Sequence, residues 1–256
     1  MLQYRHRGLQ TGMVFFDEEP GPEKVDRLYF FHRFTPLENA TCVPWRTLVL
    51  DLRTDPDGLL KNMEKTCVYK IRRAKERDNV VCEYPDPASA KVQAEFWDFF
   101  TQFASTTTVD MPDRQFVNLL TEQRRLVVST AKDVQGETVA YHVYCQGQRR
   151  ARLLYGCTLH RLEQDSGVRN AIGRANRLLF WTDILHFQEH ELETFDFGGW
   201  YPGQSDTLRL GINKFKEGFG GQIVMTYVCD RGGTLKGKIA LWIRDRVAAL
   251  RGRKDE

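Results

Sequence analysis

The sequence has no long apolar run. None approaches the roughly eighteen residues that a membrane-spanning helix needs, and the start, MLQYRHRGLQTG, lacks the apolar stretch of a signal peptide. We therefore expect a cytoplasmic protein. Low-complexity tracts are also missing, and 41% apolar with 28% charged residues is an ordinary globular composition. A chain of 256 residues with this composition is expected to fold around one sizeable core.

Paired cysteine motifs and a strong net charge are absent as well. None of the six cysteines forms a C-x-x-C pair, so reduced, packed thiols are the expectation. A net charge of +3, from 37 basic and 34 acidic residues, is too weak to predict nonspecific nucleic-acid binding. Basic residues are denser between Lys61 and Arg77, where seven stand against two acidic ones. This segment either meets an anion or forms a solvated helix face.

The hydrophobic pattern predicts three segments. Residues 1–46 carry short apolar pieces, which read as a hairpin or two edge strands packing on the core. Residues 47–230 form the main α/β domain, and residues 231–256 contain a basic amphipathic helix. Within the main domain we expect strands at 47–52 and 80–84, and helices over 59–78, 88–104 and 112–123.

The second half of the main domain has a distinctive order of predicted strands and helices. Three strands over 125–133, 137–146 and 150–158 are joined by short turns and predict an antiparallel meander. A long helix, the strand ETFDFGG, a short helix TLRLGINKFKEG and a closing strand over 221–229 follow. The stripe of the long helix comprises Ile172, Ala175, Leu178, Leu179, Thr182 and Leu185.

This order resembles that of GNAT acyltransferases, over roughly residues 47–229. The resemblance implies an α/β fold with a mostly antiparallel central sheet flanked by helices. The predicted helix start Asn170-Ala-Ile-Gly173-Arg174 looks like a degenerate form of the GNAT acyl-CoA loop, with Asn170 where Gln or Arg is usual. A helix start with small residues presents free backbone N–H groups to a pyrophosphate. A plain helix start is the alternative.

Two further segments are similar to signatures of the Fem-like peptidoglycan-bridge ligases: FDFGG at 195–199, and GINKFKEGFGG at 211–221. In those ligases the Phe-Lys step lies beside the acyl-transfer centre, so the resemblance points to Phe215 and Lys216. In the alternative reading, the glycines end helices, Phe219 is core and Lys216 is a surface cation.

Fem-like ligases carry two GNAT units and often a helical arm for transfer RNA, whereas this sequence has room for one unit. The expected donor is therefore acyl-CoA, with aminoacyl-tRNA as an alternative. No permanently bound cofactor or metal is expected. The strand end at Leu154, Tyr155 and Gly156 could pair with a pantetheine arm, with Tyr155 as a candidate acid.

Two other residues are candidates for the chemistry of transfer. Asp196, at the end of a core strand before two glycines, could face the cleft and orient or deprotonate an amine, or could simply cap nearby amides. Lys216 could stabilise a developing oxyanion as a fixed cation. The predicted function is N-acylation of an amine on a cell-envelope precursor, an amino sugar or a small metabolite. A GNAT-fold binding module without catalysis, and a tRNA-dependent ligase, are the alternatives.

Three remaining features were weighed against simpler roles. His186 and His190 match the H-x-x-E-H zinc pattern, but they lie in a polar stretch at a helix end, and His142 reads as a core histidine. The segment 235–254 places apolar residues on one helical stripe among basic ones. It either packs on the sheet, rests on an anionic membrane near a lipid-linked acceptor, or pairs two subunits. Its stripe comprises Leu235, Ile239, Trp242, Ile243, Val247 and Leu250.

Overall fold

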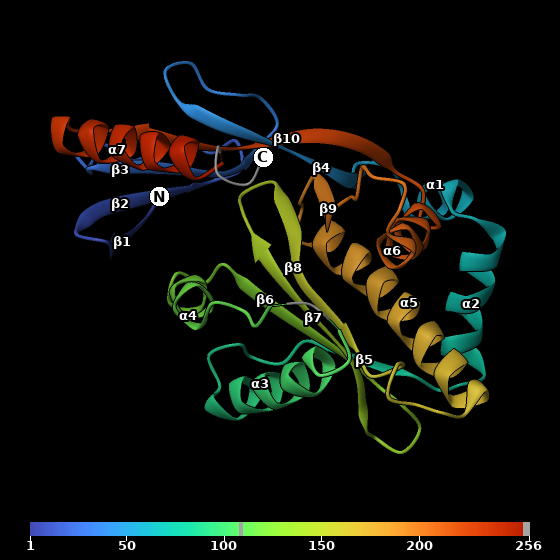
Figure 1. Ribbon diagram of the computed structural model, residues 1–256. Coiled ribbons are helices and arrows are strands. Elements are labelled where there is room, and N and C mark those ends of the chain that lie inside the picture. The colour runs from blue at the N-terminus through green and yellow to red at the C-terminus, as the bar shows by residue number, and fades with distance from the viewer. Residues whose placement is uncertain (108–109, 253–256) are drawn as a thin grey trace. The chain divides into compact units, whose positions relative to one another are not determined.

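The computed structural model describes residues 1–107 and 110–252, with side chains up to Val247 (Figure 1). The chain divides into two compact units. Unit 1 joins residues 1–47 with 224–256, and unit 2 comprises residues 48–223. The division thus groups the predicted N-terminal and C-terminal segments together. Residues 253–256 of the predicted C-terminal segment, and the side chain of Leu250, lie outside the described part.

Unit 1 is built on strands β1 (Leu2–His6), β2 (Leu9–Phe15) and β3 (Arg27–Arg33), which pair in that order. β1 and β2 form a hairpin whose two turn residues, Arg7 and Gly8, both have positive φ, as a type I′ turn requires. β2 and β3 are parallel, so the predicted hairpin between these two strands is wrong. β3 also pairs antiparallel with β10 (Gln222–Gly232), and helix α7 (Leu235–Gly252) completes the unit.

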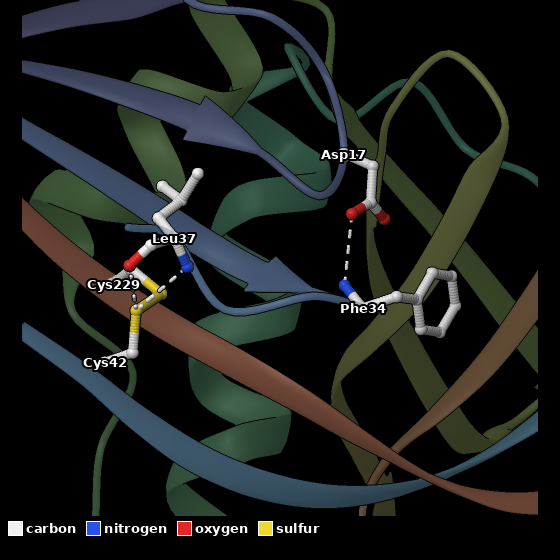
Figure 2. Close-up of a disulfide and its surroundings, with 5 residues drawn as sticks. All are labelled: Asp17, Phe34, Leu37, Cys42 and Cys229. Atoms are coloured by element: carbon white, nitrogen blue, oxygen red, sulfur yellow. Dashed lines mark hydrogen bonds between the residues drawn. A yellow bond between two sulfur atoms is a disulfide. The ribbon is translucent and has the colours of Figure 1, made fainter. Parts of the chain in front are cut away.

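A disulfide joins Cys42 on β4 (Thr41–Asp51) to Cys229 on β10, within unit 1. Figure 2 shows the bridge beside Leu37, whose backbone N–H donates to the Cys42 sulfur over 3.4 Å. In the same view the Asp17 carboxylate accepts from the Phe34 backbone N–H over 3.1 Å, which fixes the loops at the end of β3. The expectation of reduced thiols is therefore wrong for this pair, whose members stand 187 residues apart.

The sheet of unit 2 has the strand order β4-β9-β8-β7-β6-β5. The predicted meander is confirmed, because β6 (Leu126–Lys132), β7 (Thr138–Gln146) and β8 (Arg150–Thr158) pair antiparallel in sequence order. β9 (Thr194–Gly199) returns parallel to β8, and β5 (Val81–Glu83) closes the far edge. The chain reaches β9 through the long helix α5 (Ser166–Glu189). This helix was predicted because the apolar residues change from strand-like to helical spacing after β8.

The other helices of unit 2 also follow their hydrophobic patterns. The predicted helix over 59–78 occurs as α1 (Pro56–Asn62) and α2 (Lys65–Glu76), separated by a short break. The remaining ones are α3 (Ala90–Ala104), α4 (Arg114–Glu122) and α6 (Thr207–Glu217). The aromatic stripe of α3 is core: Phe96, Phe99 and Phe100 are buried. Among the residues that the structure describes, no helix is long and apolar enough to cross a membrane.

The core of unit 2 lies between the sheet and helices α2 and α5. Its centre is a group of aromatic side chains at most 4% exposed, which comprises Phe180, Phe187, Phe195, Phe197 and Phe219. Phe195 and Phe197 face this core from β9, whereas Asp196 between them points to the opposite face of the sheet, where it is also fully buried. The buried carboxylate needs cationic or hydrogen-bonding partners, because burying an unpaired charge costs a large amount of free energy.

Candidate functional site

The candidate site begins where β8 and β9 stop pairing. Their parallel register covers three residue pairs and ends with Arg152 opposite Asp196. β8 continues to Thr158 against β7, with a bulge that leaves Leu154 outside the register. Gly198 has φ +76°, and a Cβ there would come within 2.9 Å of the Leu153 carbonyl oxygen. A glycine is therefore required for β9 to pass this close to β8.

Asp196 is held by two arginines beneath this point. The Asp196 Oδ2 atom accepts hydrogen bonds from Arg150 and, over 2.7 Å, from Nη1 of Arg152. Its Oδ1 atom accepts from the Gly198 backbone N–H over 2.8 Å. Asp196 is fully buried, so the prediction that its carboxylate faces an open cleft is wrong. The alternative, in which Asp196 caps backbone amides, fits the bond from Gly198.

Lys216 reaches the same region from α6. Its ammonium donates a hydrogen bond of 2.6 Å to the carbonyl oxygen of Gly199, at the end of β9. Burial lowers the pKa of Lys216 to about 8, while the charge of Asp196 raises it and that of Arg152 lowers it. Only 8% of the residue is exposed, so the alternative reading of Lys216 as a surface cation is wrong.

These groups bring several charges together in the interior. Arg150, Arg152 and Lys216 bring three cations to one carboxylate, Asp196. Burial also lowers the pKa of Arg152. A charge in such surroundings acts more strongly than it would in water, because the effective dielectric constant is lower. The arrangement suits a ligand or a transition state that carries negative charge.

Phe215 and the glycines after it connect α6 to the core. The Phe215 ring packs against Phe180 and Phe219, and the guanidinium of Arg177 lies 4.3 Å from its centroid. Phe219 is fully buried, in agreement with its predicted core role. Gly221 has φ +94°, and a Cβ there would come within 2.5 Å of the Val49 carbonyl oxygen.

Tyr155 lies in a different neighbourhood from Lys216. Its ring contacts Phe96 and Phe100 of α3, and burial raises its pKa, so the phenol stays protonated near neutral pH. In the β7–β8 register Tyr155 stands opposite Val143, and Gly156 stands opposite His142. The roles predicted for Leu154, Tyr155 and Gly156 stay predictions.

The predicted helix start at Asn170 is wrong. Helix α5 begins at Ser166, because the Asp165 carboxylate accepts from the Val168 backbone N–H over 2.8 Å and caps the first turn. Asn170 and Gly173 lie inside the helix, where backbone N–H groups bond to carbonyls one turn earlier. The free N–H groups of this helix therefore belong to its first turn, before Asn170. Arg174 pairs with Asp78 over 2.5 Å.

The histidines occupy two distinct settings. His142 is fully buried and satisfied, with Nδ1 2.7 Å from Asp183 and Nε2 2.8 Å from the Asn176 side-chain oxygen. This agrees with its reading as a core histidine. His186 stacks on Tyr84 at 4.0 Å between ring centroids. Within residues 1–107 and 110–252, no three His, Cys, Asp or Glu side chains are grouped as a metal site would require.

A pocket of about 490 Å³ opens elsewhere in unit 2, between α2 and α5. Most of the side chains that line it are apolar, and the charged residues of the lining are Arg72, Lys75 and Glu76. None of the candidates at the strand ends, on α5 or on α6 lines it, but Arg72 and Lys75 belong to the basic segment between Lys61 and Arg77. The predicted residues therefore gather at the β8–β9 junction and on α5, away from this pocket's lining.

Sequence reasoning missed Arg150 and Arg152, although a signal was present. The strand RARLLYGCT places two arginines at alternate positions, hence on one face of a strand whose neighbours are apolar. Such a pair requires an acidic partner when buried. Asp196 is the one acidic residue of the strand TFDFGG and so a candidate for that partner, although the register that pairs the two strands cannot be read from either one.

Comparisons with known proteins support the fold. No protein-family model and no curated protein matches the sequence. Among solved structures, FemX is similar with a TM-score of 0.58 and 14% identity, over 71% of this chain and 61% of FemX. The chain thus spans less than two thirds of FemX.

Two further solved structures are similar over more of their length. The C-terminal domain of a putative lysylphosphatidylglycerol synthetase from Agrobacterium fabrum has a TM-score of 0.56 and 12% identity, over 91% of this chain and 83% of that one. L-PGS from Bacillus licheniformis has a TM-score of 0.52 and 12% identity, over 92% of this chain and 84% of that one. The chain therefore shares its fold with FemX and these two structures, which agrees with the predicted α/β fold of a central sheet flanked by helices.

Proposed function

We propose that the protein transfers an acyl or aminoacyl group from an activated donor to an amine. The observation that carries this proposal is the buried Lys216, in the electrostatic field of Arg152 and Asp196, at the point where the pairing of β8 and β9 ends. The fold supports the same class of reaction, because the similar solved structures include FemX and a putative lysylphosphatidylglycerol synthetase.

The reaction makes one bond and breaks another. The neutral amine nitrogen attacks the donor carbonyl carbon, and the bond from that carbon to the leaving sulfur or oxygen breaks. The amine loses a proton and the leaving group gains one, so no oxidant or reductant is needed. Negative charge develops on the carbonyl oxygen, and a preorganised cation in a low-dielectric site stabilises it. Lys216 would provide that cation.

The neighbouring groups have supporting roles in this proposal. Asp196, held by Arg150 and Arg152, fixes the end of β9 through the Gly198 N–H and acts as a positioning residue. The strand end from Leu154 to Gly156 would offer backbone groups to the donor, since the ladder to β9 ends at Arg152. Tyr155, which is protonated near neutral pH, is the candidate acid for the leaving group, on condition that the donor extends along β8 to its ring beside α3.

Acyl-CoA is the first candidate donor, as the resemblance of residues 47–229 to GNAT acyltransferases implies. An aminoacyl donor is the second candidate. The similarity to the C-terminal domain of a putative lysylphosphatidylglycerol synthetase favours it. The acceptor would be an amine on a cell-envelope precursor, an amino sugar or a small metabolite. Asn170 and Gly173 are not proposed as the pyrophosphate site, since they lie inside α5.

Binding measurements separate these donors. Calorimetric titration with acetyl-CoA, a long-chain acyl-CoA and an aminoacyl-tRNA should give saturable binding for one class. Binding of an acyl-CoA supports the first candidate, and binding of the aminoacyl-tRNA alone supports the second. The Lys216→Ala variant should bind the same donor with similar affinity but turn it over slowly. Failure to bind any of the three would overturn the transferase and leave a binding module.

A further inference from the structure

Helix α7 turns its apolar stripe toward solvent. The exposed fractions are 74% for Leu235, 51% for Ile239, 61% for Trp242, 50% for Ile243 and 41% for Val247. These positions recur at helical spacing, so they form one continuous stripe along the helix. Scattered exposed apolar residues are ordinary, but a contiguous stripe of this kind indicates an interaction surface.

The opposite side of α7 is fixed to its own unit by polar and small residues. Figure 1 shows α7 running along β3. Gly237 lies against the backbone of Asp26, so close that no side chain would fit. Arg244 pairs with Asp230 of β10 over 2.5 Å. Because these contacts set the rotation of the helix, the apolar stripe cannot turn inward without breaking them.

Basic residues lie within and beside the stripe. Lys236 and Lys238 lie at its start, and the Arg246 guanidinium lies 5.3 Å from the centroid of the Trp242 ring. The sequence from 235 to 254 contains seven basic residues and one acidic residue, Asp245. Asp245 is neutralised by Arg244 at 2.8 Å. An apolar stripe with tryptophan and flanking lysine and arginine is the pattern of a helix that lies in a membrane interface.

We propose that α7 docks the protein on an anionic lipid membrane, with Trp242 and the two isoleucines in the acyl boundary and the basic side chains among the headgroups. This proposal is independent of the transferase activity. Pairing with a second copy would bring the basic residues of both stripes together, and like charges in an interface are unfavourable. An anionic surface instead complements them, because each lysine or arginine near the headgroups is attracted to the negative surface potential.

Cosedimentation with lipid vesicles tests this docking. The full chain is mixed with vesicles of pure phosphatidylcholine, or of phosphatidylcholine with about one third phosphatidylglycerol. We expect binding to the anionic vesicles that weakens as salt is raised. The Ile239→Ser/Ile243→Ser variant should bind at least about tenfold more weakly, since it loses apolar burial. Lys238→Gln/Arg246→Gln should lose affinity for the anionic vesicles only.

A matched control removes exposed apolar groups elsewhere. Val81 and Val134, at 53% and 66% exposure, lie in unit 2, and Val81→Ser/Val134→Ser should bind vesicles like the unaltered protein. The proposal is overturned if the protein ignores anionic vesicles, or if the isoleucine variant binds them normally. It is also overturned if light scattering shows a dimer that the isoleucine variant abolishes while vesicle binding is absent. Donor binding by calorimetry is unaffected by any of these outcomes.

Discussion

Two glycine-containing segments of unit 2, Asn170–Gly173 and Lys216–Gly221, each resemble a functional motif in sequence, the second more specifically, and they differ in structure. The first segment lies inside α5, which begins at Ser166. A Cβ built on Gly173 would have no neighbouring atom within 4 Å. The second ends a helix, buries a lysine and passes two glycines close to backbone carbonyls. A motif is therefore better judged by what its residues contact than by its spacing, and only the second segment is assembled as a site would be.

Removing the central carboxylate should have the largest effect on stability. Asp196→Asn removes the carboxylate charge that the buried Arg150 and Arg152 share, so we expect a loss of about 3–5 kcal/mol in the free energy of unfolding. Urea unfolding measures this loss. The exposed pair of Asp51 and Arg53 provides the control, and Asp51→Asn should cost less than about 1 kcal/mol. Equal costs for the two variants would show that the buried cluster is not a structural centre.

The titration of Lys216 should separate stability from activity. Its pKa is lowered to about 8 in the folded state, against about 10.5 unfolded. Between these values the unfolded state binds more protons, so stability should rise with pH from about 8 to 10.5, by up to about 3 kcal/mol. Lys216→Met should abolish this rise in pH-dependent unfolding experiments.

The same titration should lower activity, because a neutral amine cannot stabilise an oxyanion as a cation does. Turnover should fall as the pH rises through about 8. In Lys216→Arg the residual activity should persist to higher pH, since a guanidinium keeps its charge. If turnover falls at the same alkaline pH in the unaltered protein and in Lys216→Arg, the titrating group is not Lys216.

Substitution in the Asn170–Gly173 segment should change stability but not donor binding. Gly173 lies in the interior of α5 with no atom within 4 Å of a Cβ, so Gly173→Ala should raise the free energy of unfolding by about 0.5–1 kcal/mol. Donor affinity should stay unchanged. Thermal unfolding and calorimetric titration check the two parts, and weaker donor binding in a stabilised variant would return Gly173 to the site.

Much of unit 2 could be predicted from sequence because its signals are local. The meander, α5, β9 and α6 follow from a period of two or of 3.6 and from short turns. The start of α5 was missed, although Asp165 followed by Ser and Gly is a recognisable cap. A nearby resemblance to the acyl-CoA loop outweighed this capping signal in the sequence reading.

Other features depend on contacts between distant segments. The register that sets Arg152 opposite Asp196 joins strands separated by α5, and no pattern within either strand gives it. The disulfide of Cys42 and Cys229 likewise bridges 187 residues. The outward stripe of α7 has the same hydrophobic pattern as a buried one, so only the packing of Gly237 and Arg244 reveals which side faces solvent.

Turnover of the Lys216→Ala variant tests the central claim most directly, once a donor is identified by calorimetry. Lys214 provides a matched control, because it lies on the same last turn of α6 but is exposed. Lys216→Ala should lower the turnover rate by about ten- to a thousandfold. Lys214→Ala should change turnover less than about twofold, as expected for a solvated cation. Normal turnover in a folded Lys216→Ala variant would contradict the account and leave Tyr155 and the β8 strand end to support the chemistry.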